Sequence, residues 1–406
     1  SANVAIGTHA LEDQDAGTAY NVAVGHAAGR NVTTGTANTI MGGLAGDALT
    51  TGYGNIAIGY NALSSEDTGG TNVAIGHAAL QVQDSGANAY NVAIGYDAGK
   101  AITTGTHNTI IGGDAGKALN SGGGNVAIGT EALSAEDGHG RNIAIGVNAL
   151  KVQDAGADAY NVAIGYNAGV AVSTGVRNTI LGGVAGDALT TGSNNVAIGY
   201  QALTTEDTGN KSIAIGDSTL SQQNYDGDAH NIAIGHNAGE NVSTGRYNLL
   251  FGSLAGDALT TGSENIAIGY AALSTEDGNG KNIAIGTNAL EDLNAGADAY
   301  NVAIGHDAGR NVSTGVRNVI MGGLAADALT SGGYNVAIGY SALGSEDTGA
   351  RSVAIGYAAL GLQNYNGDAY NIAIGYSSGS EITSGTYNNI IGGLAGDALN
   401  SGARNI

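Results

Sequence analysis

Pairs of acidic residues recur along this chain and are the groups best suited to chemistry. A glutamate is followed directly by an aspartate once every 70 residues, and another Asp or Asn lies 17 residues after that aspartate. The pairs are Glu66-Asp67, Glu136-Asp137, Glu206-Asp207, Glu276-Asp277 and Glu346-Asp347, and the later residues are Asp84, Asp154, Asn224, Asn294 and Asn364. Carboxylates suit Ca²⁺, which takes several oxygen ligands at about 2.3 to 2.6 Å.

The elements that must position these acids follow from a shorter repeat that fills the chain. The segment NVAIG at residues 161–165 returns, with Asn or Ser first and Gly fifth, at intervals of 17, 17, 17 and 19 residues. Gly, Ser, Thr and Asn interrupt every segment and no apolar pattern of 3.6-residue period persists, which excludes a helical solenoid. We therefore predict an all-β protein, a parallel β-solenoid of 17 residues per coil in most coils, with four coils in each 70-residue cycle.

Two positions of the repeat carry a specific prediction. The fifth residue is Gly in every complete copy, which indicates a corner whose backbone dihedral or close approach excludes other residues. The first residue, usually Asn, is expected to stack on its copies and form hydrogen bonds up the column. The alternative is that Asn only favours the turn. Proline is absent from the chain, as expected if nearly every backbone N–H belongs to a ladder.

Bulky residues exchange places within each cycle. In the cycle 91–160, the first two coils have Gly at the ninth place and a large aliphatic residue at the twelfth. The last two coils have Leu133 and Leu150 at the ninth place and Glu136 and Gln153 at the twelfth. A close-packed interior of constant cross-section would require such compensation. We predict one elongated domain over residues 1–406 and, because the pattern is interrupted at both ends, a fragment of a longer fibre.

The repeated strand carries apolar residues on both of its faces in the second coil of each cycle. Ile110 occupies the middle place there and Ile111 the next, on the opposite face. Strands that are apolar on both faces are usually buried on both. One face can contact the chain's own core, and the simplest cover for the other is another copy of the chain around a common axis. A monomer with a wide interior is the alternative.

These repeats resemble a known family. NVAIG, together with KSIAIG at residues 211–216 and RSVAIG at residues 351–356, resembles the SVAIG-type repeat in the head domains of trimeric autotransporter adhesins, the YadA-like heads. The array is also similar to the IGYxAL repeats of bacteriophage tail fibres. The coils here are longer than those of a typical head.

The resemblance covers essentially the whole chain, and it implies a fold and a function. The expected fold is a left-handed parallel β-roll interlocked as a homotrimer. The pattern interrupted at both ends separately predicts a fragment of a longer fibre or a unit that stacks end to end as a filament. The expected place is extracellular, at a cell surface, and the expected partners are a host matrix protein or a surface glycan. The alternative is the shaft of a receptor-binding tail fibre on a virion.

Tyrosines recur on two rows. The row that follows the fifth-place Gly is a candidate surface for stacking on sugars or docking a protein: Tyr60, Tyr96, Tyr166, Tyr200, Tyr270, Tyr340 and Tyr376. The other row precedes the first-place Asn: Tyr20, Tyr90, Tyr160, Tyr300 and Tyr370. For this second row we predict that the rings seal the corner where the 19-residue coil bulges.

The acidic residues have two interpretations. Carboxylates one strand spacing apart repel unless a cation offsets their charge, so a series of calcium sites is one hypothesis. Its ligands would be Asp67, Asp84, Asp137, Asp154, Asp207, Asp277 and Asp347. The alternative, which needs no cofactor, is a solvated turn whose charges prevent aggregation along the flank.

Composition argues against several classes of function. The net charge is −22 and the 13 Lys and Arg residues do not cluster, so neither nucleic acid nor an anionic membrane is an expected partner. No run of about 20 apolar residues occurs, so we expect no membrane insertion in this segment. The eight His residues are spread over different coil positions, without a partnered nucleophile or paired ligands at metal spacing, and there is no Cys. We expect no catalytic residues, and hence a protein that is not an enzyme.

Overall fold

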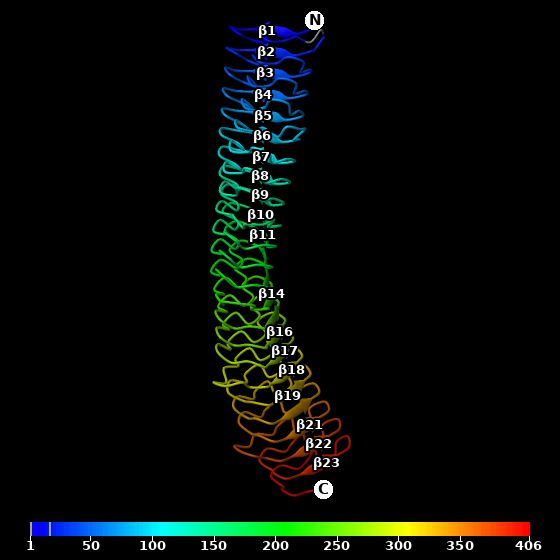
Figure 1. Cartoon of the computed structure of the whole chain (residues 1–406). Coiled ribbons are helices and arrows are strands. Elements are labelled where there is room, and N and C mark those ends of the chain that lie inside the picture. The colour runs from blue at the N-terminus through cyan, green and yellow to red at the C-terminus, as the bar shows by residue number, and fades with distance from the viewer. Residues whose placement is uncertain (1, 16–17) are drawn as a thin grey trace. The chain divides into compact units, whose positions relative to one another are not determined.

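The computed structural model describes residues 2–15 and 18–406, and these residues form strands and turns without a helix. The chain divides into two compact units, Ser1–Tyr200 and Gln201–Ile406. Each unit is a parallel β-solenoid in which one short strand per coil pairs with the strands of the coils before and after it (Figure 1). The predicted fold class is therefore confirmed.

The strands each have three residues. In the first unit they are β1 Val4–Ile6, β2 Val22–Val24, β3 Thr39–Met41, β4 Ile56–Ile58, β5 Val73–Ile75, β6 Val92–Ile94, β7 Thr109–Ile111, β8 Val126–Ile128, β9 Ile143–Ile145, β10 Val162–Ile164, β11 Thr179–Leu181 and β12 Val196–Ile198. In the second unit they are β13 Ile213–Ile215, β14 Ile232–Ile234, β15 Leu249–Phe251, β16 Ile266–Ile268, β17 Ile283–Ile285, β18 Val302–Ile304, β19 Val319–Met321, β20 Val336–Ile338, β21 Val353–Ile355, β22 Ile372–Ile374 and β23 Asn389–Ile391.

The strands stack without any shift in register. Ala163 of β10 pairs with Ile180 of β11, so equivalent positions of the repeat lie directly above one another. The middle residue of each strand from β2 onward points into the coil and is buried. The two flanking residues point outward, and several of them are exposed. Because side chains alternate across a strand, this register gives one inward row and two outward rows in each unit.

The interior of each coil is filled by side chains. Ala at the middle of the strand, Ala at the eighth place and Leu or Ile at the ninth or twelfth are buried in both units. The predicted exchange of bulk is confirmed, since Ile102, Leu133 and Leu150 are all fully buried. A Cβ on Gly116 would lie 3.0 Å from Ile110 Cδ1, so Gly at the ninth place makes room for a larger middle residue. The described coils have no wide interior for the outward rows to face.

The Asn column joins each coil to the next. Asn161 Oδ1 accepts a hydrogen bond from the backbone N–H of Asn178 at 2.8 Å, and Asn161 Nδ2 donates to the carbonyl oxygen of Gly175 at 2.7 Å. The same two bonds recur along the described chain, and the Asn side chains in the interior of each unit are buried. The predicted column is present, but most of its hydrogen bonds join an Asn side chain to the backbone and not one Asn side chain to another.

The fifth-place Gly forms the predicted corner. Gly112 has a φ of +137°, a conformation that L-residues with a side chain rarely adopt, and a Cβ added to it would lie 2.5 Å from the carbonyl oxygen of Gly129 in the next coil. Both the dihedral and the close approach of two backbones require Gly here.

Candidate functional site

The glutamate of each acidic pair lies inside the coil. Glu66, Glu136, Glu206, Glu276 and Glu346 are all fully buried. They occupy the twelfth place, which holds a buried aliphatic residue such as Ile102 in other coils. The interpretation of the pairs as solvated turns is therefore wrong for the glutamates, because their position in the coil directs the side chain inward.

Three of these carboxylates have hydrogen-bond donors for both oxygens. Glu66 Oε1 accepts from the backbone N–H of Gly69 at 2.7 Å, and Glu66 Oε2 accepts from Gln83 Nε2 of the next coil at 3.1 Å. Glu206 and Glu346 make the equivalent bonds, to a Gly three residues later and to a Gln 17 residues later. Buried carboxylates cost much less free energy when donors satisfy both oxygens.

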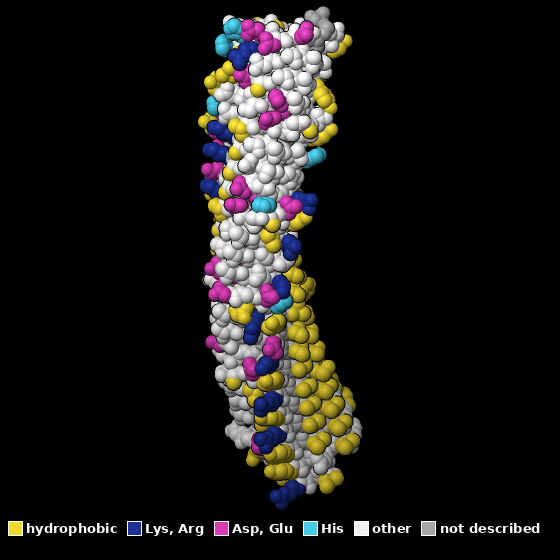
Figure 2. Space-filling view, viewed as in Figure 1, with side chains coloured by type: hydrophobic (Ala, Val, Ile, Leu, Met, Phe, Trp, Pro, Cys, Tyr) yellow, Lys and Arg dark blue, Asp and Glu magenta, His cyan; other side chains and the backbone are white. Residues whose placement is uncertain are grey.

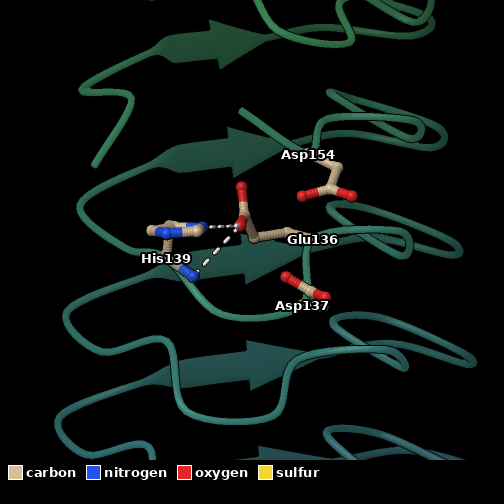
Figure 3. Close-up of side chains that lie close together, drawn as sticks. All are labelled: Glu136, Asp137, His139 and Asp154. Carbon is tan, nitrogen blue, oxygen red and sulfur yellow. Dashed lines mark hydrogen bonds and ion pairs between the residues drawn. The ribbon is translucent and has the colours of Figure 1, made fainter. Parts of the chain in front are cut away.

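Glu136 has a different set of partners (Figure 3). Its Oε1 accepts from the backbone N–H of His139 at 3.1 Å and lies 3.7 Å from His139 Nδ1, while its Oε2 is buried without a hydrogen-bond partner. Gln153, which would be the donor by analogy, donates instead to the carbonyl oxygen of Ser173 at 3.1 Å. Burial raises the pKa of Glu136 to about 7.

The residue three places after the glutamate explains this difference. A Cβ on Gly69 would lie 2.5 Å from Glu66 Cδ, so only Gly leaves the carboxylate where Gln83 can reach it. His139 has a Cβ, and so does Asn279, which follows Glu276 at the same distance. Glu276 Oε2 is likewise buried without a partner, and burial raises its pKa. At Glu276, moreover, Leu293 takes the place of Gln83, so the donor to the second carboxylate oxygen is absent there.

The predicted aspartates come together in two of the five cycles. Donor atoms of Glu136, Asp137, His139 and Asp154 lie within 4.8 Å of one another, and so do donor atoms of Glu66, Asp67 and Asp84. Burial and the charge of Asp67 raise the pKa of Asp84. Around Asp207, Asp277 and Asp347 no comparable group occurs among the described residues, because the residue in the next coil is Asn. Calcium binding stays a prediction.

The sequence pattern did not predict that Glu136 and His139 would lie with these aspartates. The change from Gly to His at residue 139 is nevertheless visible in the sequence.

The candidate tyrosine row lies on the surface, and part of it forms stacks of aromatic rings. Tyr60, His77 and Tyr96 form a stack with ring centroids 5.6 and 5.0 Å apart, and Tyr340, Tyr357 and Tyr376 form another at 5.6 and 5.3 Å. Tyr166, Tyr200 and Tyr270 are also exposed. Stacking covers the faces of the central rings, so a partner would meet mainly ring edges and hydroxyl groups there.

The second tyrosine row does not seal a corner. Tyr20, Tyr90, Tyr160, Tyr300 and Tyr370 are between 37% and 67% exposed, which corrects the prediction. Several of these rings contact the residue at the same place in an adjacent coil: Tyr90 stacks on His107, Tyr370 stacks on Tyr387, and the Arg141 guanidinium lies 5.4 Å from the Tyr160 ring centroid. The side chain therefore points away from the core and gains its contacts along the surface.

Comparison with known proteins adds no family. Neither a scan against protein-family models nor a search of curated proteins finds a match to this chain. None of the described segments forms a helix long and apolar enough to cross a membrane. The repetitive β-solenoid is compatible with a structural fibre or an adhesin.

Proposed function

We propose that this chain is an extracellular structural or adhesive protein, which assembles as a homotrimer through the outward face of its strands and presents its remaining surface for attachment. The observation that carries the proposal is the apolar character of that face. Phe251 is 50% exposed there, Met321 is 38% exposed, and Ile232 and Ile372 are exposed as well. In the second unit hydrophobic side chains gather into a continuous area over the strands (Figure 2).

The face suits another copy of the same chain. None of the described strands contains a charged residue, so the acidic charge of the chain lies elsewhere. Each unit stacks more than ten strands with two outward side chains apiece, which offers a long row of side chains for an interface of the standard size, roughly 800 Å² per partner. Rows that repeat at one strand spacing match the rows of an identical copy in register.

The attachment role rests on the resemblance of the repeats to adhesin heads and on the exposed tyrosine row. Tyrosine combines apolar contact area with a hydroxyl group that can donate or accept a hydrogen bond, which is why it is common at recognition surfaces. A surface glycan or a host matrix protein is the partner that we propose. The resemblance also supports a place at the cell surface.

The mass of the full chain in solution tests this proposal. Light scattering should give the mass of three chains for the wild type and of one chain for the double variant Phe251→Lys, Met321→Lys, because two charges per chain would have to be buried. Leu362→Lys is the control, since Leu362 is exposed but lies outside the strands, and it should keep the wild-type mass. The wild type, the double variant and Leu362→Lys should have the same far-UV circular dichroism spectrum, which would show that all three proteins fold alike. A wild-type mass of one chain would overturn the proposal.

A further inference from the structure

One junction between two coils brings an imidazole and three carboxylates close together, and one oxygen of the buried carboxylate has no hydrogen-bond partner. We propose that Glu136, Asp137, His139 and Asp154 bind one divalent transition-metal ion, of which Zn²⁺ is the representative. The four side chains come from two successive coils of the first unit and lie close together (Figure 3). This site is independent of the proposed assembly, because none of the four residues belongs to a strand.

The donor set favours a transition metal over calcium. Calcium takes six to eight oxygen ligands, whereas imidazole together with carboxylates suits Zn²⁺ and its neighbours in the first transition row. The cluster of Glu66, Asp67 and Asp84 has no imidazole, and both Glu66 oxygens already accept hydrogen bonds. Of the two clusters, only the one at Glu136 has both a nitrogen atom that can bind a metal ion and a buried carboxylate oxygen that accepts no hydrogen bond.

The distances permit closure around an ion. The four donor atoms lie within 4.8 Å of one another, and ligands at about 2.0 to 2.2 Å from a tetrahedral Zn²⁺ lie about 3.3 to 3.6 Å apart. Inward movement of about 1 Å is therefore needed. Asp137 and Asp154 are exposed and His139 is half-buried, so their side chains can rotate, while buried Glu136 forms the fixed part of the site.

The second unit contains a natural comparison. Glu276 is also fully buried with an unpartnered Oε2, but Asn279 takes the place of His139 and Asn294 the place of Asp154. A buried carboxylate oxygen without a hydrogen-bond partner is thus common to both sites, whereas the imidazole and the second aspartate occur only at Glu136. A variant that carries His139→Asn and Asp154→Asn takes the residues of the Glu276 site at these two positions and keeps Gln153 where that site has Leu293, so it should fold.

Calorimetric titration of the metal-free full chain with Zn²⁺ tests the proposal. We expect one ion per wild-type chain and an affinity at least tenfold weaker in the double variant His139→Asn, Asp154→Asn. His77→Asn removes an exposed histidine that lies 3.5 Å from Asp97, and this control should retain the wild-type affinity and stoichiometry. Zn²⁺ should also raise the melting temperature of the wild type and of His77→Asn, but not that of the double variant.

Three results would overturn the assignment. The first is no binding of Zn²⁺ to the wild type, and the second is equal affinity in the wild type and the double variant. The third is binding of Ca²⁺ but not Zn²⁺ in a parallel titration, which would assign the acidic residues to calcium. Because this experiment measures metal affinity, a wild-type mass of one chain in light scattering would not affect the metal proposal. Absence of metal binding would likewise not affect the proposed trimer.

Discussion

In this fold the pKa of a carboxyl group depends on the place of its residue in the coil. The tenth place of the second coil is Asp in most cycles, among them Asp47, Asp187, Asp257 and Asp327. Burial raises the pKa of each of these carboxyl groups. At Asp257 the pKa rises to about 6, first because of burial and then because of the nearby Glu240 charge. One Asp257 oxygen is buried without a hydrogen-bond partner.

The raised pKa of Asp257 predicts a pH-dependent loss of stability. The folded chain holds this proton up to about pH 6, whereas the unfolded chain releases it near pH 4, so the free energy of unfolding falls as pH rises between these values and stays low above pH 6. Asp257→Asn should therefore raise the urea midpoint at pH 8 and change it much less at pH 4.

The matched control has the opposite sign. Lys211 lies 2.5 Å from Asp228 and lowers the pKa of that carboxyl group. Asp228→Asn should therefore lower the urea midpoint slightly at pH 8, the direction expected for an exposed ion pair. An Asp257→Asn variant that is less stable than the wild type at pH 8 would contradict the assignment of a buried charge.

The coil is the element that repeats, and its corners determine which residues can change. Gly112 and Gly113 are adjacent, yet only Gly112 has a positive φ. A Cβ added to Gly112 would also overlap the backbone carbonyl group of Gly129 in the next coil. A Cβ on Gly113 would meet open space. Several larger residues also adopt a positive φ, among them Leu133 at 52° and Arg141 at 64°. Their cost, about 1 to 2 kcal/mol for each residue, must be offset by burial and ladder bonds.

The two glycines make a matched pair of variants. Gly112→Ala should destabilise the first unit by at least about 2 kcal/mol, because it combines an unfavourable dihedral with overlap of two backbones. Gly113→Ala should change stability by less than about 0.5 kcal/mol. Urea unfolding followed by circular dichroism measures both. Equal effects of the two substitutions would mean that the close approach of coils at this corner is not a constraint.

At the scale of the whole molecule, charge and the apolar sheet face act in opposite directions. Each chain carries a net charge of −22, so copies that approach one another repel. The strand face that we propose as the interface has no charge. Association should therefore depend on burial of apolar area, with a repulsion that salt screens.

Salt is accordingly expected to strengthen self-association. Raising the ionic strength from about 0.01 M to about 0.15 M shortens the screening length from about 30 Å to about 8 Å, which weakens repulsion between copies and leaves apolar burial nearly unchanged. Sedimentation velocity at the two salt concentrations should give a larger assembled fraction at the higher one. Dissociation on addition of salt would indicate instead an interface held by ion pairs.

The sequence alone determined the repeat, the strand in each coil, the Gly corner and the exchange of bulk between Leu133 and residues such as Ile102. These features follow from local periodicity, because identical segments that stack in register must meet the same packing requirement in every coil. The coming together of Asp137 and Asp154 also followed, since their separation equals one coil.

Only the tertiary structure decided which acidic side chain points inward and which polar groups satisfy it. Glu136 and Asp137 are neighbours in sequence, but one is buried and the other exposed. Sequence composition assigns both to solvent because charged residues are rarely buried. The orphaned oxygen of Glu136 depends on the Cβ of His139 and on the rotation of Gln153 toward Ser173. Both depend on how particular side chains are oriented in the folded coil, which a repeat pattern does not encode.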